Sequence, residues 1–249
     1  MRRLLAYGVV LVAVLLPWWA VTAAGAVAPL TLPPPATVAS ALGELLADPG
    51  TWASAVAVTV GRTASGFGLA ALVAVPLGVF LGRSRLLGRA YEPLLATLAA
   101  VPLVVLYPVL SATLGIGTAS KVTLGCLYAF FPIAIAAVRA AGQVDPELLT
   151  AMRSMGAAPS RLAGSVVLPS ALPGIVSGLR VGLGLALVTV IAAEFIAGDA
   201  GVGYRLAAAG QGYRSADLFA WVALAVVLTI VVNALFTLFA TLLERSIRR

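Results

Sequence analysis

The chain has 249 residues, of which 61% are hydrophobic and only 10% are charged, whereas soluble domains usually carry about 25% charged residues. This composition excludes an ordinary soluble domain and indicates an integral membrane protein. The net charge of +7 does not indicate nucleic-acid binding, because the 16 Lys and Arg residues are scattered between apolar segments. A single cysteine and no histidine argue against a disulfide framework, a metal site and histidine acid/base chemistry.

The first predicted element is a transmembrane helix within residues 1–28. Arg2 and Arg3 precede a long uncharged run. This run exceeds the roughly 7–15 apolar residues of a signal peptide, so a membrane helix is favoured over a cleaved signal, although small residues near its end resemble a cleavage site. Residues 29–51 form a predicted external segment, because the sequence PLTLPPP breaks the helix. An amphipathic surface helix is then indicated by the helical spacing of Val38, Leu42, Leu45 and Leu46.

Residues 52–249 form the predicted core domain, with five further transmembrane helices. The first of these, at residues 52–81, is apolar except for Arg62. Three arginines follow it at once, at positions 83, 85 and 89. Under the positive-inside rule, this end of the helix lies in the cytoplasm.

The next predicted span, at residues 93–114, contains Pro102 and Pro108. Proline breaks a membrane helix and is tolerated where neighbouring helices or a water-filled cavity satisfy the freed carbonyl groups. Both prolines, and Tyr107 between them, are therefore candidates for the wall of a translocation pathway. A purely structural kink at the prolines and interfacial anchoring of Tyr107 remain open alternatives.

Three more spans are predicted, at residues 122–138, 172–197 and 218–243. The sequence therefore predicts an all-α protein with about six transmembrane helices. Most arginines at the ends of the spans fall on one side, and Lys121, Arg205 and Arg214 fall on the other. Both termini, and the segment between the fourth and fifth spans, are therefore predicted to be cytoplasmic. The fifth span contains four glycines, Gly174, Gly178, Gly182 and Gly184. We expect these small residues to allow close helix packing within the core, in preference to forming a dimer interface or a pathway wall.

The cytoplasmic segment at residues 145–169 carries clear helix punctuation. Asp145 is suited to cap a helix that starts at Pro146, and Gly156 is suited to end it. A second helix start follows at Pro159. These features predict two short helices with a kink between them, although the caps alone are also compatible with an ordinary solvated loop.

The same segment resembles the cytoplasmic signature of ABC importer permeases. That signature is a Glu-Ala-Ala triplet, then a glycine after three residues, then Ile-x-Leu-Pro after nine more. Gly156 takes the place of the glycine, and Leu168 and Pro169 close the motif at the same spacing. The triplet departs from the pattern, because Thr150, Ala151 and Met152 occupy it and the acidic residue is missing.

Further stretches between residues 32 and 245 extend the resemblance to the nitrate, sulfonate and taurine branch of these permeases. They include LPPPATV, VPLVVLYPVL, AAEFIAG and GVGY. The resemblance implies a type I ABC importer transmembrane domain in a bacterial inner membrane, with residues 145–169 as the coupling loop. It also implies two cytoplasmic ATPase subunits, an external substrate-binding protein and a second permease copy, most simply an identical one. The residues that it assigns to ATPase coupling are Thr150, Ala151, Arg153, Gly156, Ala157, Pro159 and Arg161.

ATP chemistry is not expected in this chain. The sequence has no Gly-x-x-x-x-Gly-Lys-Ser/Thr run and so has no phosphate-cradling loop of its own. We therefore expect no cofactor, no metal and no catalytic residue here, with ATP and Mg²⁺ bound by the partner ATPases. Within the coupling loop, Arg153 and Arg161 are expected either to pair with acidic residues of the ATPase or to contact lipid phosphates.

Arg62 and Glu194 are the charges that intrude farthest into apolar spans, and either one would be costly if buried without a partner. We predict that they pair and brace the outer half of the domain. Contact with an anionic substrate, or no contact between the two, are the alternatives.

The solute is expected to be a small anion of the sulfonate, taurine or nitrate class. A vitamin precursor or another organic solute imported by the same branch is an alternative. A different class of function is an ATP-independent secondary transporter or channel. Such proteins usually bury several polar groups at the middle of the membrane or show inverted repeats, and these spans show neither, which disfavours this class.

Overall fold

The computed structural model describes residues 2–247, and every regular element in this range is helical. The elements are α1 (Arg2–Ala23), α2 (Pro35–Ala47), α3 (Pro49–Gly82), α4 (Arg85–Ala99), the 3-10 helix η1 (Leu103–Leu106), α5 (Tyr107–Leu114), α6 (Thr118–Gly142), α7 (Pro146–Ser154), α8 (Pro159–Leu162), the π-helical segment η2 (Ala163–Val167), α9 (Leu168–Ala197), α10 (Val202–Gln211) and α11 (Ser215–Ile247). The predicted all-α fold is confirmed.

Four helical segments of the described chain are long and apolar enough to cross a membrane. They are Pro49–Gly82, Thr118–Gly142, Gly164–Gln211 and Ser215–Leu242. A fifth crossing is formed by the helices Leu86–Ala99 and Leu103–Leu114 if this bent pair counts as one span. In α1, the stretch Val12–Ala23 is a shorter apolar helix, while residue 1 and the side chains of residues 2–11 lie outside the part that the structure describes. The predicted first transmembrane helix therefore stays a prediction.

The third predicted span is broken, with a bend of 66° between its halves. The break lies at residues 100–102, where Pro102 has no N–H to continue the helix. The first half also begins earlier than predicted, at Arg85, because the side chain of Ser84 caps it by accepting a hydrogen bond from the backbone N–H of Leu87 at 3.3 Å. Pro93 consequently lies inside α4 and not at its start.

Three long helices, α3, α6 and α9, form the centre of the bundle and pack closely through small residues. A Cβ added at Gly78 of α3 would lie 2.5 Å from the Cβ of Ala137 in α6. On α9, a Cβ added at Gly174, Gly178 or Gly182 would likewise lie only 2.3–2.7 Å from a side chain of α6. The predicted role of these three glycines in core packing is confirmed, whereas Gly184 has only Asn233 nearby, at 3.8 Å.

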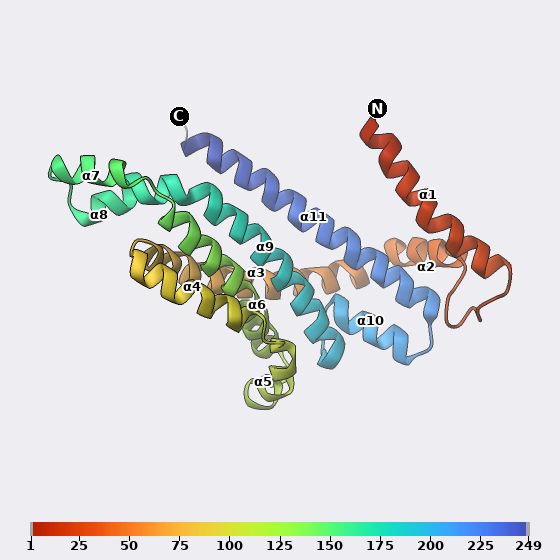
Figure 1. Cartoon of the computed structure of the whole chain (residues 1–249). Coiled ribbons are helices and arrows are strands. Elements are labelled where there is room, and N and C mark those ends of the chain that lie inside the picture. The colour runs from red at the N-terminus through yellow and green to blue at the C-terminus, as the bar shows by residue number, and fades with distance from the viewer. Residues whose placement is uncertain (1, 248–249) are drawn as a thin grey trace.

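The two ends of the bundle carry different elements (Figure 1). The short helices α7 and α8 project at one end, and both ends of the chain lie toward the same side of the picture. The elements α5 and α10 lie at the opposite end. There, α3 begins at an N-cap, because the Thr51 hydroxyl and backbone N–H both donate to the Asp48 carboxylate, which holds the pKa of Asp48 below its usual value.

Candidate functional site

The helix α7 begins and ends where the sequence predicts. The Asp145 carboxylate accepts a hydrogen bond from the backbone N–H of Glu147 at 2.8 Å. At the other end, Gly156 has a φ of +77°, and the backbone N–H groups of Gly156 and Ala157 donate to the carbonyls of Arg153 (2.9 Å) and Met152 (3.1 Å). This pair of bonds is a Schellman motif, in which glycine takes the left-handed conformation without the cost that a Cβ would impose.

The second half of the predicted loop is helical. The helix α8 starts at Pro159, as predicted, and then runs through η2 into α9 without a break. Pro169 therefore lies in the first turn of α9, not at the end of a loop. A proline inside a continuous helix clashes with the carbonyl four residues earlier, and the wider π-helical turn lies immediately before this proline.

One face of α7 packs on the bundle and the other is exposed. Leu149 and Met152 pack against a buried cluster that includes Val144 and Val167. Among the residues assigned to ATPase coupling, Ala157 is half-buried. The exposed ones are Thr150, Ala151, Arg153, Gly156 and Arg161. The Ser154 hydroxyl donates to the Thr150 carbonyl at 3.1 Å. For Pro159 the structure gives its place at the start of α8, and its side chain lies outside the described part.

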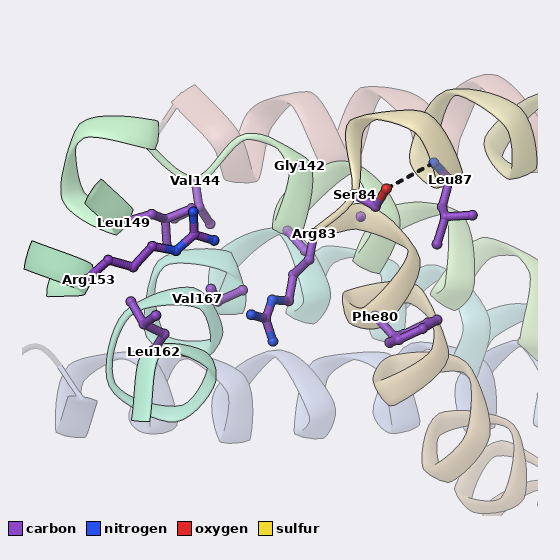
Figure 2. Close-up of a pocket in the computed structure, with 12 residues that line it drawn as sticks. Phe80, Arg83, Ser84, Leu87, Gly142, Val144, Leu149, Arg153, Leu162 and Val167 are labelled. Carbon is purple, nitrogen blue, oxygen red and sulfur yellow. Dashed lines mark hydrogen bonds between the residues drawn. The ribbon is translucent and has the colours of Figure 1, made fainter. Parts of the chain in front are cut away.

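A cavity of 540 Å³ lies between α7 and the bundle (Figure 2). It is enclosed by the end of α3, the start of α4, the end of α6, α7 and the segment from α8 to η2. The side chains of Arg83 and Arg153 reach into it from opposite sides (Figure 2). The exposed face of α7 and this cavity together make the end of the bundle that carries α7 suited to contact other molecules.

At the other end of the bundle, Arg62 and Glu194 form the predicted ion pair, with 3.0 Å between Nη1 and Oε1. Both side chains are buried, with 4% and 0% of their surface exposed. The Glu194 carboxylate also accepts hydrogen bonds from the Thr59 hydroxyl at 2.8 Å and the Gly203 backbone N–H at 3.1 Å. These bonds replace the water that both charges would otherwise lose.

The pair belongs to a larger group that we call the polar network: Thr59, Arg62, Thr118, Lys121, Glu194 and Asp199. The Arg62 guanidinium also lies 2.8 Å from Asp199 and donates to the Ala200 carbonyl at 2.8 Å. The Lys121 ammonium is fully buried, 3.4 Å from Asp199. The network thus joins α3, the start of α6, the end of α9 and the turn that leads to α10.

Lys121 and Asp199 were not predicted from the sequence to be members of this network. Lys121 was predicted only to lie on the side opposite most arginines, and that placement stays a prediction. The burial of its side chain, which also donates to the carbonyls of Ile116 and Gly117, was not predicted. Asp199 stands five residues after Glu194 in the turn following α9. The sequence did offer one signal for Asp199, namely a second acidic residue close to the glutamate of an apolar span. No local pattern of residues connects this acid with Lys121.

The pathway candidates of the broken third span occupy different surroundings. Tyr107 is buried, with 1% of its surface exposed, and its hydroxyl donates to the Ala197 carbonyl at 3.0 Å. This bond ties α5 to the end of α9 and occupies the hydroxyl. Pro102 and Pro108 are exposed. The part of all three in a pathway stays a prediction.

A second groove, of 480 Å³, crosses α4, α6 and α9. Its walls consist mainly of small and apolar residues, and its polar groups are Arg139, Gln143 and Ser177. The Arg139 guanidinium lies 2.7 Å from the Glu92 carboxylate of α4. Elsewhere within residues 2–247, no group of three or more His, Cys, Asp and Glu side chains is arranged to hold a metal ion.

Comparison with known proteins identifies the family. Residues 74–249 match the family described as the inner membrane component of binding-protein-dependent transport systems. The chain belongs to this family. The taurine transport system permease protein of Escherichia coli K12 is 32% identical over 198 residues, which cover 78% of this chain and 72% of that protein. A putative aliphatic sulfonates transport permease protein of Bacillus subtilis is 31% identical over 241 residues, or 96% and 86% of the two chains.

The fold is also that of a solved ABC importer. A chain in an inward-facing structure of the MetNI methionine ABC transporter superposes with a TM-score of 0.65 at 22% sequence identity, covering 78% of this chain and 95% of that one. This likeness concerns the fold alone. The family match and the two relatives show that the chain is a permease of the ABC importer type.

Proposed function

We propose that this permease, paired with a second copy of itself, forms the membrane path of an importer that two cytoplasmic ATPases drive and an external binding protein supplies. The observation that carries the proposal is the geometry of α7, a short helix with a firm cap at each end and one exposed face. A rigid projecting helix is suited to sit in a groove of a partner and to transmit its movement. On this proposal, α7, α8 and both termini lie in the cytoplasm, in accord with the arginines after α3.

The transported solute is proposed to be a small anion. The relatives carry names that refer to taurine, aliphatic sulfonates and nitrate. The groove across α4, α6 and α9 offers a guanidinium, an amide and a hydroxyl on a wall of small residues, from Arg139, Gln143 and Ser177. In lipid such polar groups are favoured only beside protein or a water-filled passage, which supports this groove as part of the path.

Coupling is tested by changing the backbone conformation at the end of α7 while the side chains of α7 itself stay unchanged. In Gly156→Val a β-branched residue must adopt a φ near +77°, which disfavours the Schellman motif and should turn α7 away from its docking direction. We expect a loss of about tenfold or more in the affinity for a co-expressed ABC ATPase subunit, measured by copurification and titration. Gly210→Val is the matched control, because Gly210 lies in α10 with open space around it.

Unchanged ATPase binding by Gly156→Val would contradict the docking of α7. A complementary variant, Thr150→Glu, restores the acid that the family signature carries at this position. We expect it to strengthen ATPase binding by several fold, since hydrogen bonds to a charged acceptor are stronger than neutral ones. The solute itself is tested by uptake of labelled taurine, an alkanesulfonate and nitrate into proteoliposomes that contain the complete importer and its binding protein.

A further inference from the structure

The cavity behind α7 combines two positive side chains with apolar walls. Its apolar lining comes from Phe80, Leu87, Val144, Leu149, Leu162 and Val167. Its charges come from Arg83, which directly follows α3, and from Arg153 in the last turn of α7. Figure 2 shows both guanidinium groups within the space that these side chains enclose.

Neither arginine has a carboxylate partner in the part of the chain that the structure describes. The described ion pairs of arginine involve Arg62, Arg139 and Arg214 instead. The only other side-chain hydrogen-bonding group in the cavity lining, the hydroxyl of Ser84, accepts a bond from the Leu87 N–H. Two like charges that share a partly enclosed space repel each other, and an anion between them converts this repulsion into two charge-assisted contacts.

The walls and the location of the cavity indicate which anion fits. Arg83 directly follows the last residue of Pro49–Gly82, a helix long and apolar enough to span a membrane, so the cavity lies at one end of that helix. A free phosphate would leave the apolar wall without a contact, whereas a phospholipid places a phosphate beside hydrocarbon. Basic pockets between helices on the cytoplasmic side are suited to anionic headgroups.

We propose that this cavity binds the phosphate of an anionic phospholipid, held between Arg83 of the α3–α4 turn and Arg153 of α7. The lipid would connect the proposed coupling helix to the bundle at a second point, beside the apolar contacts of Leu149 and Met152. Bound lipid would therefore stiffen α7 for its work with the ATPase. The inference rests on the proposed cytoplasmic placement of α7.

The test uses the full-length permease, without ATPase, in nanodiscs of phosphatidylcholine with a small fraction of phosphatidylglycerol. Bound lipid is counted by native mass spectrometry. We expect retained phosphatidylglycerol in the unchanged protein and a loss of about tenfold or more in Arg83→Gln/Arg153→Gln, since each basic residue near an anionic surface contributes about 1 kcal/mol. Arg89→Gln is the matched control, because Arg89 is exposed on α4 and does not line the cavity.

A conservative variant, Arg83→Lys/Arg153→Lys, separates loss of charge from loss of folding and should keep most of the lipid. Equal retention of phosphatidylglycerol by the Gln double variant and the unchanged protein would overturn the proposal. It would also be overturned if that variant lost only ATPase binding in purely neutral bilayers, because the arginines would then serve an acidic surface of the ATPase. Since lipid is counted without ATPase or solute, this result is independent of the outcome of the coupling and uptake experiments.

Discussion

Arg62 and Arg153 are both placed near an end of the helix bundle, yet their surroundings differ completely. Arg62 is buried and contacts Glu194, Asp199 and two further groups within residues 2–247. Arg153 is exposed, lines a cavity and has no ion pair in the described part of the chain. The difference indicates that the end with α10 satisfies its own charges and holds the helices together, whereas the end with α7 has charges available for other molecules.

The largest effect is expected from removing the buried guanidinium. Arg62→Gln leaves the buried Glu194 carboxylate without its cation, while Asp199 keeps Lys121. Breaking a buried pair costs about 3–5 kcal/mol of stability. Thermal unfolding in detergent, followed by tryptophan fluorescence, measures the loss. Arg205→Gln is the control at the same end of the bundle, where an exposed arginine should change stability by less than about 0.5 kcal/mol.

The double variant Arg62→Gln/Glu194→Gln sharpens the result. If the two residues act as a pair, the double loss is clearly smaller than the sum of the two single losses. Additive losses would contradict the pairing and would weaken the contrast between the two ends of the molecule.

A smaller effect is expected from Gly201, the residue that shapes the turn beside the network. Its φ is +102°, and a Cβ here would collide with the Glu194 carboxylate. Gly201→Ala should therefore cost about 1–3 kcal/mol through backbone strain and displacement of Glu194. Gly68→Ala is the control, since Gly68 lies within α3 with open space around it, and alanine there should stabilise by about 0.5–1 kcal/mol. Equal effects of the two substitutions in unfolding experiments would count against a tightly built network.

The smallest effect is expected from the exposed pair Arg139–Glu92. The side chains are 59% and 33% exposed, and exposed ion pairs contribute about 0–1 kcal/mol. Glu92→Gln should thus change the unfolding temperature little, and the change should shrink further in high salt. A loss of stability as large as that of Arg62→Gln would show that burial does not explain the difference between Arg62 and Arg139.

Much of α7 is predictable from the sequence because its boundaries depend on neighbours in the chain. An Asp before a Pro and a Gly after three helical turns favour one local backbone conformation wherever the segment lies. The helical continuation from Pro159 through Pro169 was not predictable in the same way. Its prolines favour a break in the helix. The structure instead has a π-helical segment here, where Val166 and Val167 pack into a buried cluster.

The sequence by itself determined that this is a membrane protein with long apolar helices and a capped helix between them. It also predicted the Arg62–Glu194 pair, because a charge in an apolar span needs a partner and few were available. Only the tertiary structure decided that Lys121 and Asp199 join that pair, and that Arg83 and Arg153 face one cavity. Such contacts join residues that are far apart in the chain, and their distances follow from how the helices pack, which no local pattern of residues encodes.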